Sequence, residues 1–320
     1  MPHRQHDLFH RHPDNPILTA DDWPYRVNSV FNAGATLIDG QTLLLARVED
    51  RTGISHLCAA RSDDGVADWR IDPEPTFRPD PANHPEELWG VEDPRITHRP
   101  DTAEYLVTYT AFSEAGPLVS LATTRDFKAF QRLGPIAPPQ DKDAAVLPMR
   151  FDGRWALIHR PCGGVQCPGH ICMSFSPDLK HWGDFRFIMR ARRGGWWDAN
   201  KIGLSPPPLE TPAGWLILYH GVRVTASNSL YRLGLALLDR DDPTHVLRRS
   251  DAWVFGPRDP YEIQGDVDHV VFPCGWTLVG DEIRLYYGGA DTCLAVATAS
   301  CREVLDYVLA LPEYKPLHAE

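Results

Sequence analysis

The stretch ATTRDFKAF (residues 122–130) decides the fold, because its pattern recurs along the chain. A short apolar strand runs into a turn of Ser, Thr and Asp residues, and an aromatic or large apolar residue follows. The pattern returns in AARSDDGVADW, SFSPDLKHW and LLDRDDPTHVL, and more weakly in ATASCREVLDYV (residues 59–69, 174–182, 237–247 and 297–308). The copies lie roughly 50 to 65 residues apart, at or just above the length of a four-stranded propeller blade.

Short apolar runs such as EYLVTYTAF and GWLILYHGV lie between these turns, and 29 Pro and 24 Gly residues punctuate them. Five copies in 320 residues predict an all-β fold, a five-bladed β-propeller with a central active-site pocket. A long β-sandwich is the alternative, but a turn at the same place in each repeat favours blades. We expect an extended N-terminal arm (1–24), the propeller (25–310) and a C-terminal tail (311–320).

The composition narrows the function. With a net charge of -11 and no run of Lys or Arg, the chain is a poor candidate for binding nucleic acid or an anionic membrane. No stretch approaches the roughly 18 apolar residues of a membrane span, and the first residues contain no apolar secretory signal. We therefore expect a cytoplasmic protein with reduced cysteines. The N-terminal arm could pack on a second copy of the chain, so a homo-oligomer stays one of the alternatives.

Cysteine spacing predicts no metal site. Cys162, Cys167 and Cys172 are five residues apart, whereas the paired ligands of zinc usually lie two to four apart.

Two adjacent carboxylates interrupt the apolar stretch LWGVEDPRI (residues 88–96). Asp93 precedes Pro94, so we expect its backbone to be held in the extended region, a rigidity that suits a catalytic acid. Glu92 is its neighbour on a predicted strand, so the two side chains should point to opposite faces and should not cooperate. Asp93 is the side chain that we expect to face the channel.

Four basic side chains adjoin apolar strands on different predicted blades: Arg47, Lys142, Arg160 and His220. A charge so close to a core is costly unless it is paired or bound to an anion. The alternative is that each of the four residues is paired in its own salt bridge. Their matching positions at strand ends indicate instead a common anion site, which suits phosphate.

The motif GVEDPRI, with NSVFNAG upstream and WLILYHGV, YRLGLALLD and YYGGAD downstream, closely resembles the β-mannoside phosphorylases of glycoside hydrolase family 130. The resemblance runs from Tyr25 to Ser300, and it implies a five-bladed propeller, in agreement with the repeats. It also implies inverting phosphorolysis of a β-mannoside to α-mannose 1-phosphate and a shortened acceptor. Inorganic phosphate would be the co-substrate, with no cofactor and no metal.

The resemblance also assigns residues. Asp93 would be the general acid, acting through the 3-hydroxyl of the mannose. Phosphate contacts would fall on Arg47, Lys142, Arg160, His220 and Tyr231, although some relatives carry Arg in place of Lys142. Substrate contacts or the pocket wall would fall on Asn28, Ser29, Arg51, His159, Asp198, Lys201 and Asp291. One acid with a cationic cluster suits phosphorolysis, because phosphate is already anionic and needs no second carboxylate as a base.

Three other functions stay open on the sequence. A β-mannosidase of the same family would carry acidic residues at the phosphate positions, where this chain has His220 and Tyr231. Another five-bladed glycosidase could use Glu262 as its acid, and a non-catalytic sugar-binding propeller would need no buried acid. The linkage, β-1,4 or β-1,2, is not fixed by the motifs; we expect loops 83–89 and 162–170 to shape the acceptor site.

Overall fold

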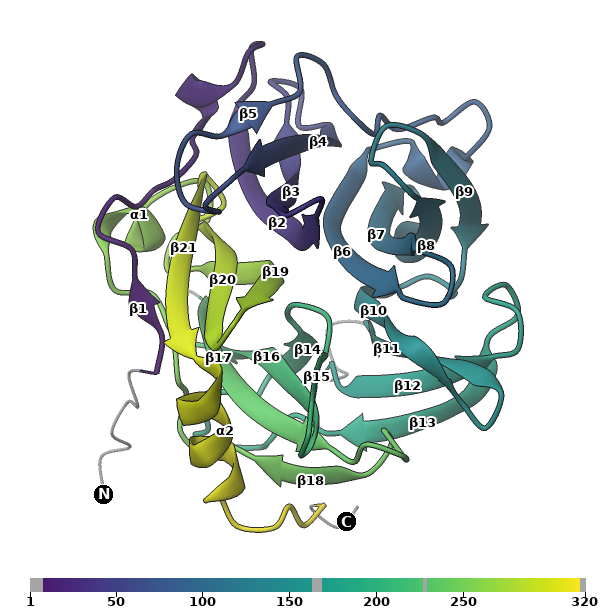
Figure 1. Ribbon diagram of the computed structural model, residues 1–320, viewed down its shortest axis with the longest axis vertical. Helices are drawn as coiled ribbons and strands as arrows, with labels where there is room; N and C mark the ends of the chain where they lie inside the picture. Colours follow the sequence, from purple (N-terminus) through teal and green to yellow (C-terminus); the bar gives the residue numbers. More distant parts are fainter. Residues whose placement is uncertain (1–7, 163–168, 227–228, 317–320) are drawn as a thin grey trace.

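The computed structural model describes residues 8–162, 169–226 and 229–316, and five antiparallel sheets stand around its centre (Figure 1). The prediction of an all-β, five-bladed propeller is confirmed. The innermost strands of blades 1 to 5 are β2 (Ser29–Ile38), β6 (Val91–Arg99), β10 (Asp141–Phe151), β14 (Lys201–Leu204) and β19 (Val271–Val279). The second strands are β3 (Gln41–Glu49), β7 (Glu104–Ser113), β11 (Arg154–Pro161), β16 (Gly214–Val224) and β20 (Glu282–Gly289).

The third and outer strands complete each blade. The third strands are β4 (Ser55–Ser62), β8 (Gly116–Thr124), β12 (Ile171–Ser176), β17 (Ser229–Leu238) and β21 (Cys293–Ser300). The outer strands are β5 (Arg70–Ile71), β9 (Phe130–Pro135), β13 (Gly183–Met189), β18 (Val246–Arg249) and, in blade 5, β1 (His10–Arg11). The other elements are β15 (Leu209–Thr211), which pairs with β16, the short helices η1 (Ala20–Asp22), η2 (Pro85–Glu87) and α1 (Pro260–Ile263), and α2 (Cys301–Leu309). No helix among the described residues is long and apolar enough to cross a membrane.

The repeated turn has one chemical cause. In each of blades 1 to 4, the turn between the third and the outer strand contains an aspartate whose Oδ1 accepts hydrogen bonds from two backbone N–H groups: Asp64, Asp126, Asp178 and Asp239. Such a side chain replaces the backbone partners that a tight turn lacks. The recurrence of Asp in the sequence therefore marks the outer hairpin of each blade.

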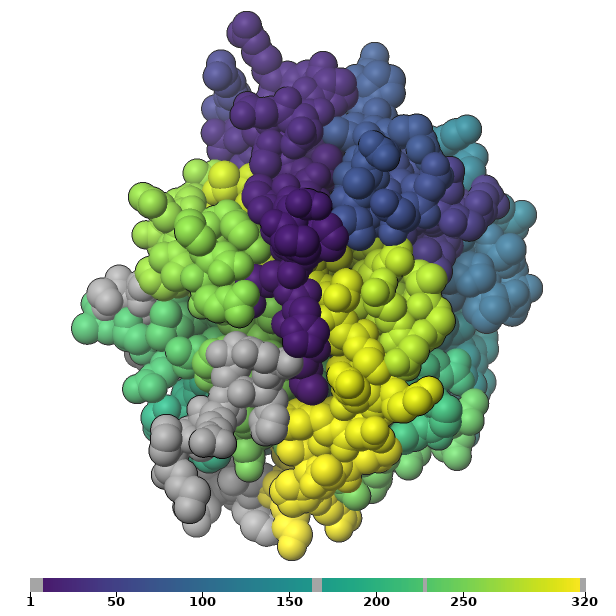
Figure 2. Space-filling view, turned by 60° about the vertical axis from the view of Figure 1, so that its left-hand side comes forward, coloured from purple at the N-terminus to yellow at the C-terminus, as the bar shows by residue number. Residues whose placement is uncertain are grey.

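The fifth copy is weaker because blade 5 has no outer hairpin of its own. Ser300 caps α2 by accepting a hydrogen bond from the N–H of Glu303, and Val304 and Val308 bury one face of the helix. The outer strand comes from the other end of the chain, where His10 pairs with Thr298. Residues that the sequence places in an N-terminal arm thus form part of a blade, and Figure 2 shows this segment lying along the C-terminal residues.

A separate apolar core fills each of the five interfaces between neighbouring blades. Strand β3 shows why the runs are continuously apolar. Leu43 and Leu45 pack against blade 2, while Leu44 between them packs against blade 5. Because successive side chains point to opposite faces and both faces are buried, every position in the middle of the strand is apolar.

The inner strands of blades 1, 2 and 3 each carry a bulge at the same level. The pairing register shifts there, and Asn32, Asp93 and Asp143 adopt left-handed backbone angles with φ of 48°, 50° and 56°. The expectation of an extended Asp93 is therefore wrong. Asn and Asp tolerate this conformation better than other residues with side chains, and a bulge re-aims the side chain that it contains.

The N-terminal strand is held by a buried ion pair. Arg11 donates to both carboxylate oxygens of Glu262, at 2.6 and 2.8 Å, and to the carbonyl of Gly256, and its guanidinium lies 4.2 Å from the ring centre of Phe255. Glu262 is fully buried and also accepts a hydrogen bond from the Tyr287 hydroxyl at 2.8 Å. This carboxylate holds the N-terminal strand in the ring and does not line the central pocket described below.

We predict that Arg11→Met lowers the free energy of unfolding by about 3–5 kcal/mol, because it leaves the Glu262 carboxylate buried without its cation. The matched control is Arg70→Met, which removes an exposed ion pair with Asp63 and should cost less than about 1 kcal/mol. Urea denaturation compares the two variants. Equal losses would show that Arg11 does not hold the ring closed.

Candidate active site

A pocket of about 280 Å³ opens at the centre of the ring, and all five blades contribute to it. Its lining comprises Asn32, Arg47, Asp93, Lys142, Asp143, Arg160, Cys162, Lys201, His220, Tyr231, Val267, Val270, Phe272 and Asp291. Eight residues predicted for the site are among them: Arg47, Asp93, Lys142, Arg160, Lys201, His220, Tyr231 and Asp291. Side chains that are up to 244 residues apart in sequence, from Arg47 to Asp291, therefore share one cavity.

Asp93 is buried, with only 2% of its surface exposed, and its two oxygens differ. Oδ1 accepts hydrogen bonds from the amide of Asn32 at 2.9 Å and from Arg47 at 3.1 Å. Among the described residues, Oδ2 has only a longer contact, 3.6 Å from the ammonium of Lys142. Burial alone would raise the pKa of Asp93, but the charges of Arg47 and then Lys142 outweigh it and hold the pKa below its ordinary value. With these neighbours the carboxyl group is ionised, and Oδ2 is the oxygen better placed to take a proton.

Arg47 connects the two neighbouring acids of the central motif. Its guanidinium contacts Glu92 at 3.1 Å and Asp93 at 3.1 Å, and its Nε donates to the hydroxyl of Ser55. The expectation that Glu92 and Asp93 point to opposite faces is therefore wrong. The bulge rotates Asp93 out of the strand alternation and brings both carboxylates to one cation.

Asp143 is the central acid that the sequence reasoning missed. It is 1% exposed, and its Oδ2 lies 2.7 Å from Nε and 2.6 Å from Nη2 of Arg160 and 3.3 Å from Nε2 of His220. Burial opposes its ionisation, but Arg160 and His220 overcome this, so its pKa lies well below the ordinary value. The signal was present in the sequence: Asp143 occupies the bulge position that Asn32 and Asp93 occupy in the two preceding blades.

His220 is a neutral donor in the empty pocket. Burial lowers its pKa to about 4, against the opposing charge of Asp143. Its Nε2 lies 3.3 Å from Oδ2 of Asp143 without a well-aligned hydrogen bond, and it has no other partner among the described residues, although the side chain is 1% exposed. Tyr231 lies beside it with ring centres 6.1 Å apart, and the ammonium of Lys201 is 5.4 Å from the centre of the Tyr231 ring. An imidazole nitrogen without a well-aligned hydrogen bond in a polar pocket points to a ligand.

Asp291 follows β20 and supplies a second titratable acid. Burial, and next the negative charge of Asp93, raise the pKa of Asp291 to about 6, against the opposing charges of Arg47 and Lys142. The pocket therefore holds two carboxyl groups whose pKa values are pushed in opposite directions. Such a difference separates the roles that two acids can take in one site.

Three predicted substrate residues are not part of the lining of this pocket. Asn28 is exposed and donates to Asp266 at 3.1 Å, and Arg51 is exposed on the turn between β3 and β4. Ser29 is buried, and its hydroxyl has no hydrogen-bond partner among the described residues. The pocket lining contains Asn32, three residues further along β2, in place of Asn28 and Ser29.

The other two substrate residues are bonded inside single blades. His159 is held between Asp141, at 2.6 Å, and Ser174, at 3.0 Å, so both ring nitrogens are satisfied. Asp198 is fully buried and contacts Arg192 at 3.0 Å and Arg249 at 2.7 Å. The structure therefore gives His159 and Asp198 structural partners and does not place them in the pocket.

Two loops, 83–89 and 162–170, are expected to shape an acceptor site. In loop 83–89, Glu87 is fully buried and paired with Arg132, whereas Trp89 is 41% exposed. In loop 162–170, Cys162 lines the pocket and receives a contact from Arg160 at 3.2 Å. Residues 163–168, with Cys167, lie outside the described residues. In the part of the chain that the structure describes, no group of three or more His, Cys, Asp or Glu side chains could hold a metal ion.

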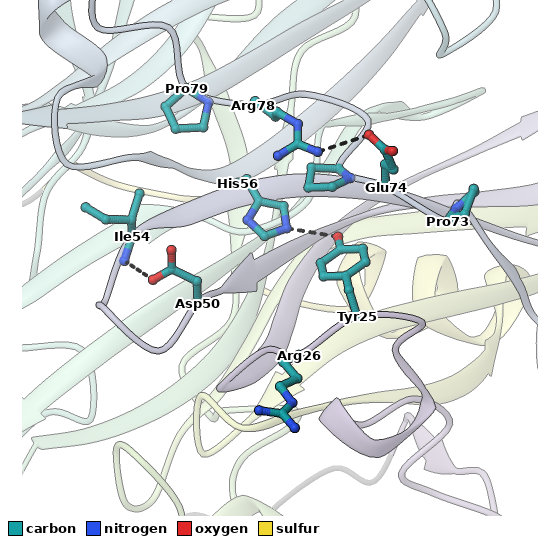
Figure 3. A pocket seen from close by; sticks show the side chains of 10 residues that line it. Tyr25, Arg26, Asp50, Ile54, His56, Pro73, Glu74, Arg78 and Pro79 are labelled. Carbon is teal, nitrogen blue, oxygen red and sulfur yellow. Dashed lines mark hydrogen bonds and ion pairs between the residues drawn. The ribbon is translucent and has the colours of Figure 1, made fainter.

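A larger cavity of about 570 Å³ lies on blade 1 (Figure 3). There the hydroxyl of Tyr25 and Nε2 of His56 are 2.9 Å apart, and Arg78 pairs with Glu74. The carboxylate of Asp50 is already used, because it accepts hydrogen bonds within the turn between β3 and β4. This cavity has no buried acid beside a cationic cluster, so its size does not make it the catalytic pocket.

Comparisons with known proteins agree with this geometry. The family model described as β-1,4-mannooligosaccharide phosphorylase, glycoside hydrolase family 130, matches residues 4–310. The chain is 33% identical over 311 residues to the β-1,4-mannooligosaccharide phosphorylase of Ruminococcus albus, covering 94% of this chain and 91% of the relative. It is 36% identical over 357 residues to the β-1,2-mannobiose phosphorylase of Listeria innocua, covering 93% and 97%. A solved structure of the Listeria innocua phosphorylase with β-1,2-mannobiose superposes with a TM-score of 0.85 at 30% identity, over 94% of this chain and 99% of that one.

The raised pKa of Asp291 predicts a pH-dependent effect on stability. Between an ordinary pKa of 3.8 and a folded-state pKa of about 6, the unfolded chain loses a proton that the folded protein keeps. The free energy of unfolding therefore falls as pH rises through this window. Asp291→Asn removes this titration, so we expect its stability relative to the unmodified protein to rise by about 1–2 kcal/mol between pH 4 and pH 7.5.

Urea denaturation at several pH values measures this difference. In an Asp93→Asn background the gain should shrink, because the charge that helps to raise the pKa of Asp291 is gone. A stability difference that stays constant with pH would contradict the prediction.

Proposed function

Because the chain belongs to glycoside hydrolase family 130, we propose that it is a β-mannoside phosphorylase in which phosphate attacks the mannose with inversion and Asp93 is the acid. The enzyme releases α-mannose 1-phosphate and a shortened acceptor. The observation that carries the residue assignment is a single buried pocket in which one acid with a free oxygen, Asp93, lies among Arg47, Lys142, Arg160 and His220. This is the set of groups that phosphate and a departing sugar oxygen require.

Phosphate binds among Arg47, Lys142, Arg160, His220 and Tyr231 in this proposal. Asp143 keeps the Arg160 guanidinium in place, with two contacts of 2.6 and 2.7 Å, and the N–H groups that contact neither Asp143 nor Cys162 remain for the ligand. A guanidinium fixed on one side is preorganised to bind an oxyanion on the other. The neutral His220 donates through Nε2 and adds no charge that would have to be removed from water.

The bound phosphate prepares the acid. In the empty pocket, Arg47 and Lys142 compensate the charge of Asp93 and keep it ionised. A dianion that shares these cations weakens this compensation and adds its own negative charge, so the pKa of Asp93 rises. Oδ2 then carries the proton, which passes to the leaving oxygen through the 3-hydroxyl of the mannose. The acid is thus protonated only when the nucleophile is present.

In this proposal the mannose binds toward Asp291, beside Asp93. Asn32 joins the proposed site residues, because its amide donates to Asp93 and its own oxygen is buried without a partner. The relatives named above act on β-1,4 and on β-1,2 linkages, so the proposal specifies a β-mannoside and leaves the acceptor to experiment. A reverse-direction screen, with α-mannose 1-phosphate and a panel of acceptor sugars, identifies it by phosphate release.

Hydrolysis by the same pocket would need a carboxylate to activate water. Glu92 pairs with Arg47 and Asp143 with Arg160, so Asp291 would have to be that base.

We predict that cleavage of β-mannosides requires phosphate and that Asp93→Asn lowers turnover by roughly 10²–10⁴-fold while substrate still binds. Product analysis with and without phosphate is the measurement, with exposed Asp63→Asn as the control. Equal release of free mannose in phosphate-free buffer would reject phosphorolysis.

Protonation of Asp93 on anion binding gives a separate test. Sulfate is a suitable probe, because it carries two charges and has no proton to exchange near pH 7. We predict that titration calorimetry in buffers of different ionisation enthalpy shows proton uptake when sulfate binds, and that Asp93→Asn loses most of it. Uptake of equal size in the variant would assign the proton to another group, such as His220 or Asp291.

A further inference from the structure

A cavity of about 270 Å³ lies on blade 4 and is separate from the catalytic pocket. Arginine and tryptophan dominate its lining, which includes Arg193, Arg223, Arg232, Trp196, Trp197 and Trp253 and contains no carboxylate. For a chain with a net charge of -11, this is an unusual concentration of positive charge. None of the residues proposed for catalysis lines it.

The cavity and the catalytic pocket lie on opposite faces of one pair of strands. On β16, His220 lines the catalytic pocket and Arg223 the cavity; on β17, Tyr231 lines the pocket and its neighbour Arg232 the cavity. Alternation along a strand produces this separation. Trp197 packs flat against the strands on the cavity side.

Two glycines make room for that tryptophan. A side chain at Gly221 would come within 2.5 Å of the Trp197 ring, and one at Gly234 within 2.6 Å. The ring of Trp197 is in turn stacked on Tyr219, with centres 5.5 Å apart, and its N–H donates to the carbonyl of Asp251. The floor of the cavity is therefore a fixed aromatic surface.

The arginines of the cavity lack the partners that their neighbours have. Arg192 is paired with Asp198 and Asp251. Among the residues that the structure describes, Arg193, Arg223 and Arg232 make no ion pair and no side-chain hydrogen bond; Arg193 and Arg223 are exposed at the mouth of the cavity, and Arg232 is half-buried. Arg232 is half-buried, 4.9 Å from the centre of the Trp253 ring. Burial, and then the like charge of Arg223, lower the pKa of Arg232.

The charges of Arg223 and Arg232 repel each other, and an anion bound between them would relieve this repulsion. Guanidinium groups bind the oxygens of phosphate through paired N–H donors. Indole rings beside them offer an apolar surface of the kind that binding sites present to a ring-shaped ligand. The two features together select an anion that carries a ring.

We propose that this cavity binds a hexose phosphate, with the phosphate held by Arg193, Arg223 and Arg232 and the sugar against the tryptophans. The choice of a hexose phosphate among ring-bearing anions rests on the proposed function, because that reaction forms mannose 1-phosphate. Mannose 6-phosphate carries the same ring and the same anion without being the product, so it serves as the probe. The site is distinct from the place where the product is made, since blade 4 separates the two.

Titration calorimetry with mannose 6-phosphate tests the proposal on the unmodified enzyme, on Arg223→Gln and on a control, Arg240→Gln. Arg240 is an exposed arginine of the same blade that pairs with Glu210. We expect Arg223→Gln to weaken binding roughly tenfold or more, and Arg240→Gln to leave it unchanged. Thermal unfolding should show no loss of stability in Arg223→Gln, because the substitution removes a repulsive charge.

Three results would overturn the proposal: no binding of mannose 6-phosphate to the unmodified enzyme, equal affinity in the two variants, or binding of inorganic phosphate that Arg223→Gln weakens to the same extent. The binding assay involves no turnover, so it stands even if phosphorolysis fails. In parallel, Arg223→Gln assayed for phosphorolysis without added hexose phosphate should match the unmodified enzyme.

Discussion

The catalytic pocket depends on two buried carboxylates that hold its cations together. Arg47 and Lys142 meet on Asp93, and Arg160 and His220 meet on Asp143. Without these acids, the charges of Arg47, Lys142 and Arg160 would repel one another within one pocket. The negative charges of the same acids offset most of the positive charge of the pocket. In the proposed mechanism, an anion that binds there therefore also changes the protonation of Asp93. Charge compensation is therefore part of the proposed mechanism as well as of the fold.

The backbone bulge that places these acids occurs in three blades. Blades 1, 2 and 3 each bend the innermost strand at one level, and the residue in the bend is Asn32, Asp93 or Asp143. Each bend interrupts the alternation of side chains and turns a polar group toward the centre, where strand geometry alone would have buried it against a neighbouring blade. One local irregularity, used three times, thus accounts for an amide and two carboxylates in one cavity.

The sequence was sufficient for the fold because its turns have a local chemical cause. Asp64, Asp126 and Asp178 each satisfy two backbone N–H groups, so the repeat is visible without tertiary information. The site was harder. Positions at strand ends indicated the basic residues and Asp93, and the motif resemblance assigned their roles, but the left-handed backbone before Pro94 runs against the usual preference and was not predicted. His159 and Asp198 have the right chemistry for a substrate, and only the structure shows that internal partners occupy them. Asp143 was overlooked beside Lys142, although its bulge position matched that of Asp93.

The pairing of β1 with β21 has a consequence for biosynthesis. The two strands that complete blade 5 come from opposite ends of the polypeptide, so His10 leaves the ribosome long before Thr298, its partner, has been made. Until translation is almost finished, blade 1 has no neighbour on one side and its apolar flank is uncovered. Until then the ring is open, and the nascent chain must be kept from aggregating. A product that lacks its last blade would also lack the surface against which its first residues dock.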